Sequence, residues 1–117
     1  MTGIEDLQTW VGRKRSIQDE MAAPLVRRMA ALTGRAGIDL NRGAAAPAHW
    51  LAMLFDDAAP QAAIGADGHP MKGDFLPPVP LPRRMLGGRR LRFLRAPRIG
   101  DALTRETTIA SITPKQG

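Results

Sequence analysis

Several kinds of residue are scarce or missing. The 117 residues include no cysteine, no tyrosine, three phenylalanines and two tryptophans. Without cysteine the chain cannot form disulfide bonds, zinc–thiolate sites or thiol nucleophiles, as is usual in a reducing cytosol. With so few aromatic side chains, it offers few surfaces on which the bases of single-stranded nucleic acid could stack.

Long apolar runs are also missing. No stretch approaches the roughly 18 consecutive apolar residues of a membrane-spanning helix. Residues 1–10 have neither the basic nor the apolar region of a signal peptide. We therefore expect a soluble, cytoplasmic protein with no membrane partner. Domains usually hold about 100–150 residues, so the length predicts a single domain, 1–117, and excludes a two-domain enzyme.

Positive charge is concentrated in the last third of the chain. Residues 1–82 contain 8 basic and 9 acidic side chains, whereas residues 83–117 contain 9 basic and 2 acidic ones. The stretch Arg83–Arg98 holds seven arginines and no acid. Such a patch attracts phosphate, on nucleic acid or on a small phosphorylated ligand. The alternative is that these arginines are ordinary solvated cations, since Arg outnumbers Lys 14 to 3 overall.

The first half of the chain predicts one main helix. Pro24 favours a helix over 23–33, because proline fits the first helical turn and pushes the residue before it out of the helical region. Gly34 would end this helix. Residues 11–18 lack a helical stripe, and we assign them as extended. The apolar run 49–55 fits either a buried strand or two helical turns.

The rest of the chain predicts irregular backbone followed by strands. Residues 56–82 hold six of the ten prolines and favour no long element. Residues 90–94 alternate arginine with apolar side chains, which predicts a strand with Leu91 and Phe93 on one face. Residues 103–112 are rich in threonine and isoleucine and predict a second strand, after a turn at 97–101.

Two segments together resemble a known family. They are DGHPMKGDFLPPVPLPRRML (Asp67–Leu86) and LRFLRAPRIGD (Leu91–Asp101), and the likeness extends from WVGR at Trp10 through His49-Trp50 to the final TPKQG. The combination resembles the N-terminal hot-dog domain of the MaoC-like (R)-specific hydratases and dehydratases. Within that family it resembles the group of mesaconyl-CoA hydratase and 3-hydroxyacyl-thioester dehydratase type 2.

The resemblance implies an α+β fold, a hot-dog-like curved antiparallel sheet with one main helix. It also implies a hydro-lyase of fatty acid metabolism that acts on coenzyme A thioesters and needs no cofactor. The family's catalytic Asp and His lie in a G-D-x-N-P-[LIV]-H motif of the C-terminal fold, and this sequence has no such motif. We therefore expect a non-catalytic N-terminal fragment that lacks its last strands and has a catalytic half as partner, in the same or another chain. A homodimer is a further alternative.

Two nearby residues imitate the missing motif. Asp67 and His69 are separated by two positions, whereas the family's catalytic pair is separated by five. They stand among turn-forming residues, so we interpret them as a turn in which Gly68 relieves backbone strain rather than as an acid–base pair. We predict no catalytic residue in this chain. We also predict no metal site, because the two histidines and the scattered carboxylates lack ligand spacing.

Six residues are candidates for contact with the acyl thioester. Arg83 and Arg84 could bind the phosphates of coenzyme A, because guanidinium groups match phosphate oxygens, or they could be a solvated pair. The other candidates lie in or beside apolar segments: His49, Trp50, Phe75 and Met85. His49 could equally be a packed, hydrogen-bonded residue of the fold.

A function of another class remains open at this point. The stretch Arg83–Arg98 could make the chain a small basic module that binds nucleic acid or an anionic surface. We do not favour nucleic acid, because stacking residues are few and no known DNA-binding spacing occurs. A third alternative is a gene remnant that does not fold alone.

Overall fold

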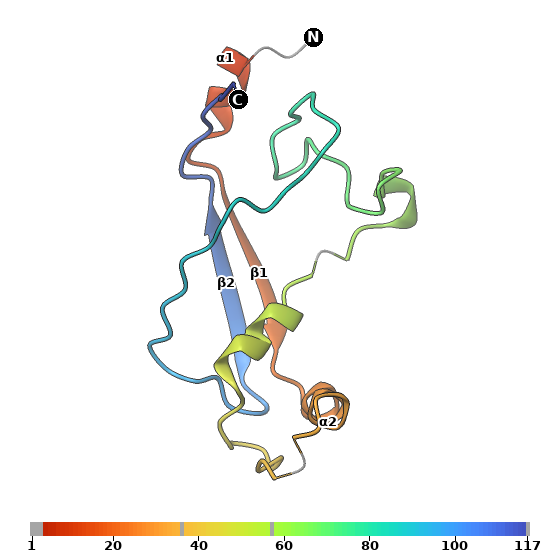
Figure 1. Ribbon diagram of the computed structural model, residues 1–117, viewed down its shortest axis with the longest axis vertical. Helices are drawn as coiled ribbons and strands as arrows, with labels where there is room; N and C mark the ends of the chain where they lie inside the picture. The colour runs from red at the N-terminus through yellow and green to blue at the C-terminus, as the bar shows by residue number, and fades with distance from the viewer. Residues whose placement is uncertain (1–3, 36, 57, 117) are drawn as a thin grey trace. The chain divides into compact units, whose positions relative to one another are not determined.

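The structure is a computed structural model that describes residues 4–35, 37–56 and 58–116. The chain divides into two compact units, which we describe separately. The first unit comprises Met1–Ser16, Asp57–Gly88 and Glu106–Gly117, and the second comprises Ile17–Asp56 and Arg89–Arg105. The described residues form a mixed α+β structure with a single two-stranded sheet (Figure 1).

Two strands of seven residues form the sheet. They are β1, Lys14–Glu20, and β2, Ala102–Thr108. Met21 donates its N–H to the Asp101 carbonyl at 3.0 Å, while Ile109 donates to the Arg13 carbonyl at 3.0 Å. Residue numbers rise along one strand as they fall along the other, so the pair is antiparallel. The extended segment expected at 11–18 is confirmed from residue 14 onward, and the strand expected at 103–112 is confirmed as far as residue 108.

A tight turn introduces β1. Arg13 donates its N–H to the Trp10 carbonyl at 3.2 Å, and the intervening Gly12 has a φ of 89°. Only a residue without a Cβ adopts that conformation readily, and Val11 before it has the φ of −64° and ψ of 133° of a type II turn. Gly12 also donates to the Ile109 carbonyl at 2.7 Å. Gly12 and Arg13 thus form a bulge opposite Ile109.

Helix α2 is the longest helix of the described chain and spans Ala23–Leu32, which confirms the helix expected at 23–33. Pro24 lies in its first turn. At the other end, Arg35 donates to the Ala30 carbonyl at 2.9 Å and Gly34 to the Ala31 carbonyl at 3.3 Å. Gly34 has a φ of 71°, so these bonds make the glycine-ended cap that the sequence predicts.

The hydrophobic core lies in the second unit. α2 contributes Val26 and Ala30, and the 3-10 helix Ala48–Met53 contributes Trp50, which is 2% exposed. In the run 49–55, residues 49–53 are therefore helical rather than a strand. The other buried members of this core are Met21, Ala46, Leu54, Phe55 and Ile99.

A short backbone pairing between residues 44–46 and residues 97–99 adjoins this core. Ala46 donates its N–H to the Pro97 carbonyl at 2.8 Å, and Ile99 donates to the Ala44 carbonyl at 2.9 Å. Ala45 and Arg98 form an antiparallel bridge between these bonds. The expected turn at 97–101 follows, with Gly100 at a φ of 94° and the Arg98 N–H bonded to the Asp101 carboxylate at 2.9 Å.

The first unit contains only short regular elements among its described residues outside the sheet. They are α1, Ile4–Leu7, and the 3-10 helices Gln8–Trp10 and Gln61–Ala63. The proline-rich residues 58–82 are otherwise irregular, as predicted. No helix of the described ranges has the length and apolar character needed to cross a bilayer.

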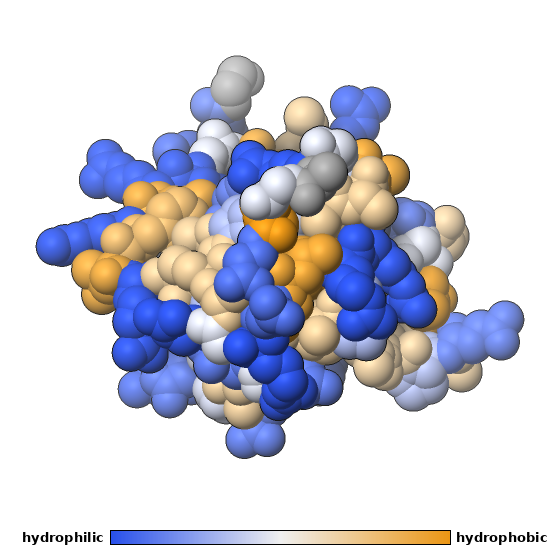
Figure 2. Space-filling model, turned by 90° about the horizontal axis from the view of Figure 1, so that it is seen from below, coloured by the Kyte–Doolittle hydropathy of each residue, from blue (hydrophilic) through white to orange (hydrophobic). Residues whose placement is uncertain are grey.

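The strand expected at 90–94 is not formed, and that prediction was wrong. These residues are exposed and irregular, and Figure 1 draws them as a plain trace. Alternation sets which face of a strand is apolar, but a strand also needs a hydrogen-bonded neighbour, and no described residue supplies one. On the face seen from below, Figure 2 shows hydrophobic residues next to hydrophilic ones.

We predict that Met21→Ala lowers the free energy of unfolding by about 2–5 kcal/mol, because truncation of a fully buried methionine leaves a cavity. Met85→Ala is the matched control: Met85 is 88% exposed, so its truncation should change stability by no more than about 0.5 kcal/mol. Urea unfolding of both variants measures the difference. Equal losses of stability in the two variants would contradict the burial of Met21 in the core.

Candidate functional site

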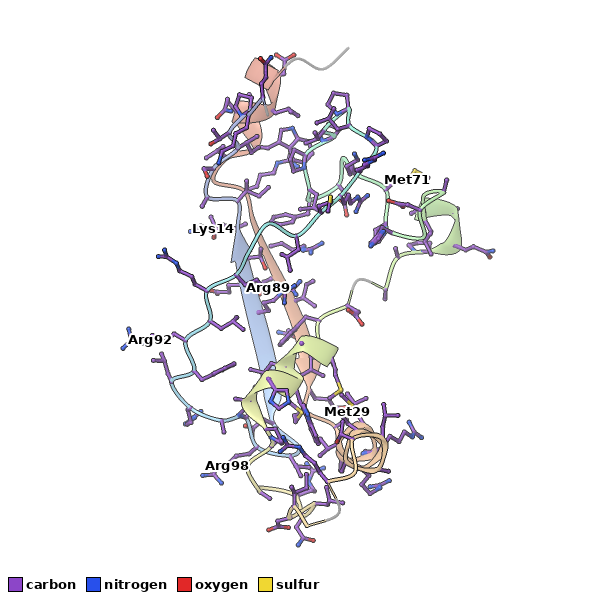
Figure 3. All side chains as sticks on the ribbon, viewed as in Figure 1. Lys14, Met29, Met71, Arg89, Arg92 and Arg98 are labelled. Atoms are coloured by element: carbon purple, nitrogen blue, oxygen red, sulfur yellow. The ribbon has the colours of Figure 1, made fainter. Side chains whose placement is uncertain are left out.

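A hollow of the first unit combines cationic and apolar side chains. Its volume is about 520 Å³. Three cations come to it from three separate stretches: Arg15 from β1, Lys72 from the loop that Met71 marks in Figure 3, and Arg84. Its apolar wall contains Pro60, Ala63, Pro70, Met71, Phe75 and Leu76, and Asp74 also lines it. Such a lining suits an anionic ligand that also carries an apolar group.

Arg15 lies against the aromatic part of the wall. Its guanidinium carbon is 4.6 Å from the centre of the Phe75 ring, and Phe75 is 8% exposed. A guanidinium over a ring face is attracted by the ring's negative potential, and this attraction is stronger away from water. On β1, Arg15 and Ile17 are the half-buried side chains of one face. The contact with Phe75 thus helps to hold the Arg15 charge at the hollow.

Lys72 holds the proline-rich segment beside the hollow. Its ammonium group donates to the Val79 carbonyl at 2.7 Å and to the Leu81 carbonyl at 2.8 Å. An ammonium group has three donors, so two hold the backbone and a third remains for a ligand.

Arg84 is held by contacts with Pro70 and Asp67. It donates from one terminal nitrogen to the Pro70 carbonyl at 2.9 Å, and its Nε lies 3.7 Å from a carboxylate oxygen of Asp67. Its side chain keeps 27% of its surface exposed. The guanidinium has five N–H donors, so these contacts leave others for a carboxylate or a phosphate.

Asp67 and His69 form the turn that the sequence predicts. The Asp67 carboxylate accepts a hydrogen bond from the His69 backbone N–H at 3.0 Å, and Gly68 between them has a φ of 81°. That hydrogen bond is the main reason why the pKa of Asp67 lies below its ordinary value, and the charges of Arg84 and His69 add to it. The side chains of Asp67 and His69 are 44% and 62% exposed. This geometry supports the turn and gives neither group an enclosed position near a substrate.

The structure brings two of the six expected contact residues to this hollow, Phe75 and Arg84. Arg83 and Met85 are exposed and do not line it. Trp50 is a core residue of the second unit, and the exposed His49 touches its ring edge-on, with centroids 6.2 Å apart at 70°.

Sequence reasoning missed Arg15 and Lys72. A signal for Arg15 existed, because the alternation Val11, Arg13, Arg15, Ile17 places Arg15 and Ile17 on one face of a strand. No local signal identifies Lys72, since its place depends on carbonyl groups seven and nine residues away. In the described part of the chain, no group of three or more His, Asp or Glu side chains could hold a metal ion.

Comparison with known proteins adds one informative match. No protein-family model matches the chain. Over 114 residues, 96% of its length, it is 38% identical to mesaconyl-C(4)-CoA hydratase of Chloroflexus aurantiacus. The chain is similar to a hydratase. It spans 40% of that hydratase's length. The identity supports the hydratase resemblance carried by the sequence motifs.

We predict that NMR titration finds the pKa of Asp67 below the ordinary value. A carboxylate with a lowered folded-state pKa contributes stability at higher pH, and this contribution disappears as the pH falls through that pKa. Arg84→Gln should move the pKa of Asp67 only part of the way back to its ordinary value, because the larger cause, the hydrogen bond from the His69 backbone N–H, remains. Arg83→Gln is the control and should leave it unchanged. Identical titrations of the wild type and the Arg84 variant would show that Arg84 does not lower the pKa of Asp67.

Proposed function

We propose that this chain belongs to the MaoC-like hydratases and supplies the N-terminal hot-dog portion of a hydro-lyase for coenzyme A thioesters. The observation that carries this proposal is the 38% identity over 96% of the chain to mesaconyl-C(4)-CoA hydratase. The chain spans 40% of that relative, which leaves ample length in such a protein for a separate catalytic portion.

We assign the chain a binding role rather than the chemical step. Hydration of an enoyl thioester requires a base that activates water, an acid for the α-carbon and a donor for the developing oxyanion. The chain has two histidines. His69 belongs to an exposed turn, and His49 packs its edge against a core tryptophan. The proton-transfer groups therefore belong to another stretch of polypeptide, in the same chain or in a partner.

The hollow of the first unit is the proposed contact with substrate. A coenzyme A thioester carries phosphate groups and hydrocarbon portions, and the hollow offers cations beside an apolar wall. Arg84 and Lys72 are held by backbone carbonyls, so their charges need little rearrangement before they meet an anion. Arg15 lies over the Phe75 ring, which attracts its guanidinium group. We infer that the hollow binds an anionic group of the thioester and that Phe75 and its neighbours contact an apolar part.

The test is calorimetric titration of the purified chain with mesaconyl-CoA. A hydrogen bond to a charged group contributes about 1.5–3 kcal/mol, so Arg84→Ala should weaken binding by about 10- to 100-fold. Arg83→Ala is the matched control, because Arg83 is exposed and does not line the hollow. Equal affinities of the two variants would contradict the assigned site.

The catalytic part of the proposal has its own readout. The same chain mixed with mesaconyl-CoA should leave the absorbance of the conjugated thioester unchanged, because it lacks the acid and the base. Measurable hydration by the purified chain would overturn the non-catalytic role while leaving the binding site in place.

A further inference from the structure

Asp67 lies in a closed loop that ends at Met71, which Figure 3 labels. Met71 donates its backbone N–H to the Ala63 carbonyl at 2.8 Å, and Gly65 donates its N–H to the His69 carbonyl at 2.8 Å. These hydrogen bonds join residues of the same loop, so the loop supports its own backbone. Asp67 therefore stands on an ordered turn from which its carboxylate can hold another side chain.

The two carboxylate oxygens of Asp67 have different neighbours. Oδ1 accepts a hydrogen bond from the His69 backbone N–H at 3.0 Å. Oδ2 lies 3.7 Å from Nε of Arg84 and 3.5 Å from Nδ1 of His69. Gly65 leaves room for this arrangement, because a Cβ at that position would lie only 3.3 Å from Oδ1. Oδ1 thus ties the carboxylate to its own loop, while Oδ2 faces Arg84.

Arg84 is held along one side of its guanidinium group. Asp67 lies beside Nε, and Nη2 donates to the Pro70 carbonyl at 2.9 Å. In the rigid fork of a guanidinium, the Nε–H and one N–H of Nη2 point to the same side. Among the described residues, none accepts a hydrogen bond from Nη1. The two contacts therefore set the orientation of the group and leave the donors of Nη1 for a ligand.

Arg84 lines two hollows of the first unit. One is the hollow of about 520 Å³ that we propose for the ligand, and the other has a volume of about 450 Å³. Asp67 lines the second hollow and does not line the first. Any effect of Asp67 on a ligand in the first hollow is therefore transmitted by Arg84 or by charge across a distance.

We propose that Asp67 is a positioning residue, which orients Arg84 so that its Nη1 meets the anionic group of a coenzyme A thioester in the first hollow. This inference rests on the proposed function. An arginine side chain loses conformational entropy when it is ordered. Because Asp67 and Pro70 order Arg84 before a ligand arrives, binding is not weakened by that loss.

The negative charge of Asp67 acts in the opposite direction, because it repels an anionic ligand. Chiefly the hydrogen bond from the His69 N–H keeps the pKa of Asp67 below its ordinary value, so the carboxylate is charged at neutral pH. Its side chain is 44% exposed, and water and salt screen charges at such positions. We therefore expect the positioning effect to exceed the repulsion.

The first experiment is calorimetric titration of the full chain with mesaconyl-CoA. Asp67→Asn keeps the shape of the side chain and removes the charge beside Nε, and it should weaken binding by about 3- to 10-fold. Asp39→Asn is the matched control, because the exposed Asp39 carboxylate also accepts a backbone N–H from two residues further on, that of Asn41, at 2.9 Å. Asp39 belongs to the second unit, so its variant should keep the wild-type affinity within about twofold.

A double-mutant cycle separates positioning from a structural role in the loop. In the Arg84→Ala background, Asp67→Asn should no longer weaken binding and should tighten it by up to about twofold, because only the repulsion remains to be removed. An equal loss of affinity in both backgrounds would show that Asp67 supports the loop without acting through Arg84, and would overturn the inference.

A second measurement needs no ligand. In the free chain, the ¹⁵N relaxation of the Arg84 Nε–H group should show a more mobile side chain in Asp67→Asn than in the wild type or in Asp39→Asn. Equal mobility in the three proteins would overturn the inference whatever the binding data.

The inference and the proposed function fail in different ways. If Arg84→Ala weakens the binding of mesaconyl-CoA while Asp67→Asn does not, the positioning role alone is wrong. If Arg84→Ala leaves the affinity unchanged, the proposed binding site is wrong, and the role of Asp67 at that site is wrong with it.

Discussion

The antiparallel pairing of β1 with β2 joins residues about ninety positions apart, and the rest of the structure depends on it. In the second unit the pairing ends at Met21, which is fully buried and exchanges hydrogen bonds with Gly100 and Asp101. In the first unit it ends at the bulge of Gly12 and Arg13 opposite Ile109. A two-stranded sheet is marginally stable by itself, so packing along its half-buried face has to supplement the ladder.

Arginine side chains supply much of that packing, because they lie against the few aromatic rings of the chain. Arg13 lies 3.6 Å from the Trp10 ring centre, Arg15 4.6 Å from that of Phe75, and Arg105 5.5 Å from that of Phe55. The long apolar stem of arginine covers a ring while its charge stays near water. In the first unit this arrangement also places a cation in the hollow. The contacts that stabilise the unit and those that would hold an anion are thus made by the same side chains.

The sequence predicted the elements whose type or bounds depend on residues within or next to them. Pro24 and Gly34 set the bounds of α2, and β-branched residues indicated β2. The strand expected at 90–94 is not formed, because alternation determines which face of a strand is apolar but supplies no hydrogen-bonded neighbouring strand. The site was predicted in part. Phe75 and Arg84 were identified from their types and neighbours, whereas Lys72 is held at the hollow by the carbonyl groups of Val79 and Leu81, which no sequence pattern reveals.

We propose that the hollow of the first unit binds a coenzyme A thioester and that the catalytic groups belong to other residues. Mapping NMR chemical-shift changes during addition of mesaconyl-CoA tests it most directly. The account predicts saturable changes at Arg15, Lys72, Phe75 and Arg84, with the core around Trp50 undisturbed. Changes centred on α2 and the Trp50 core, or none at saturating ligand, would contradict it.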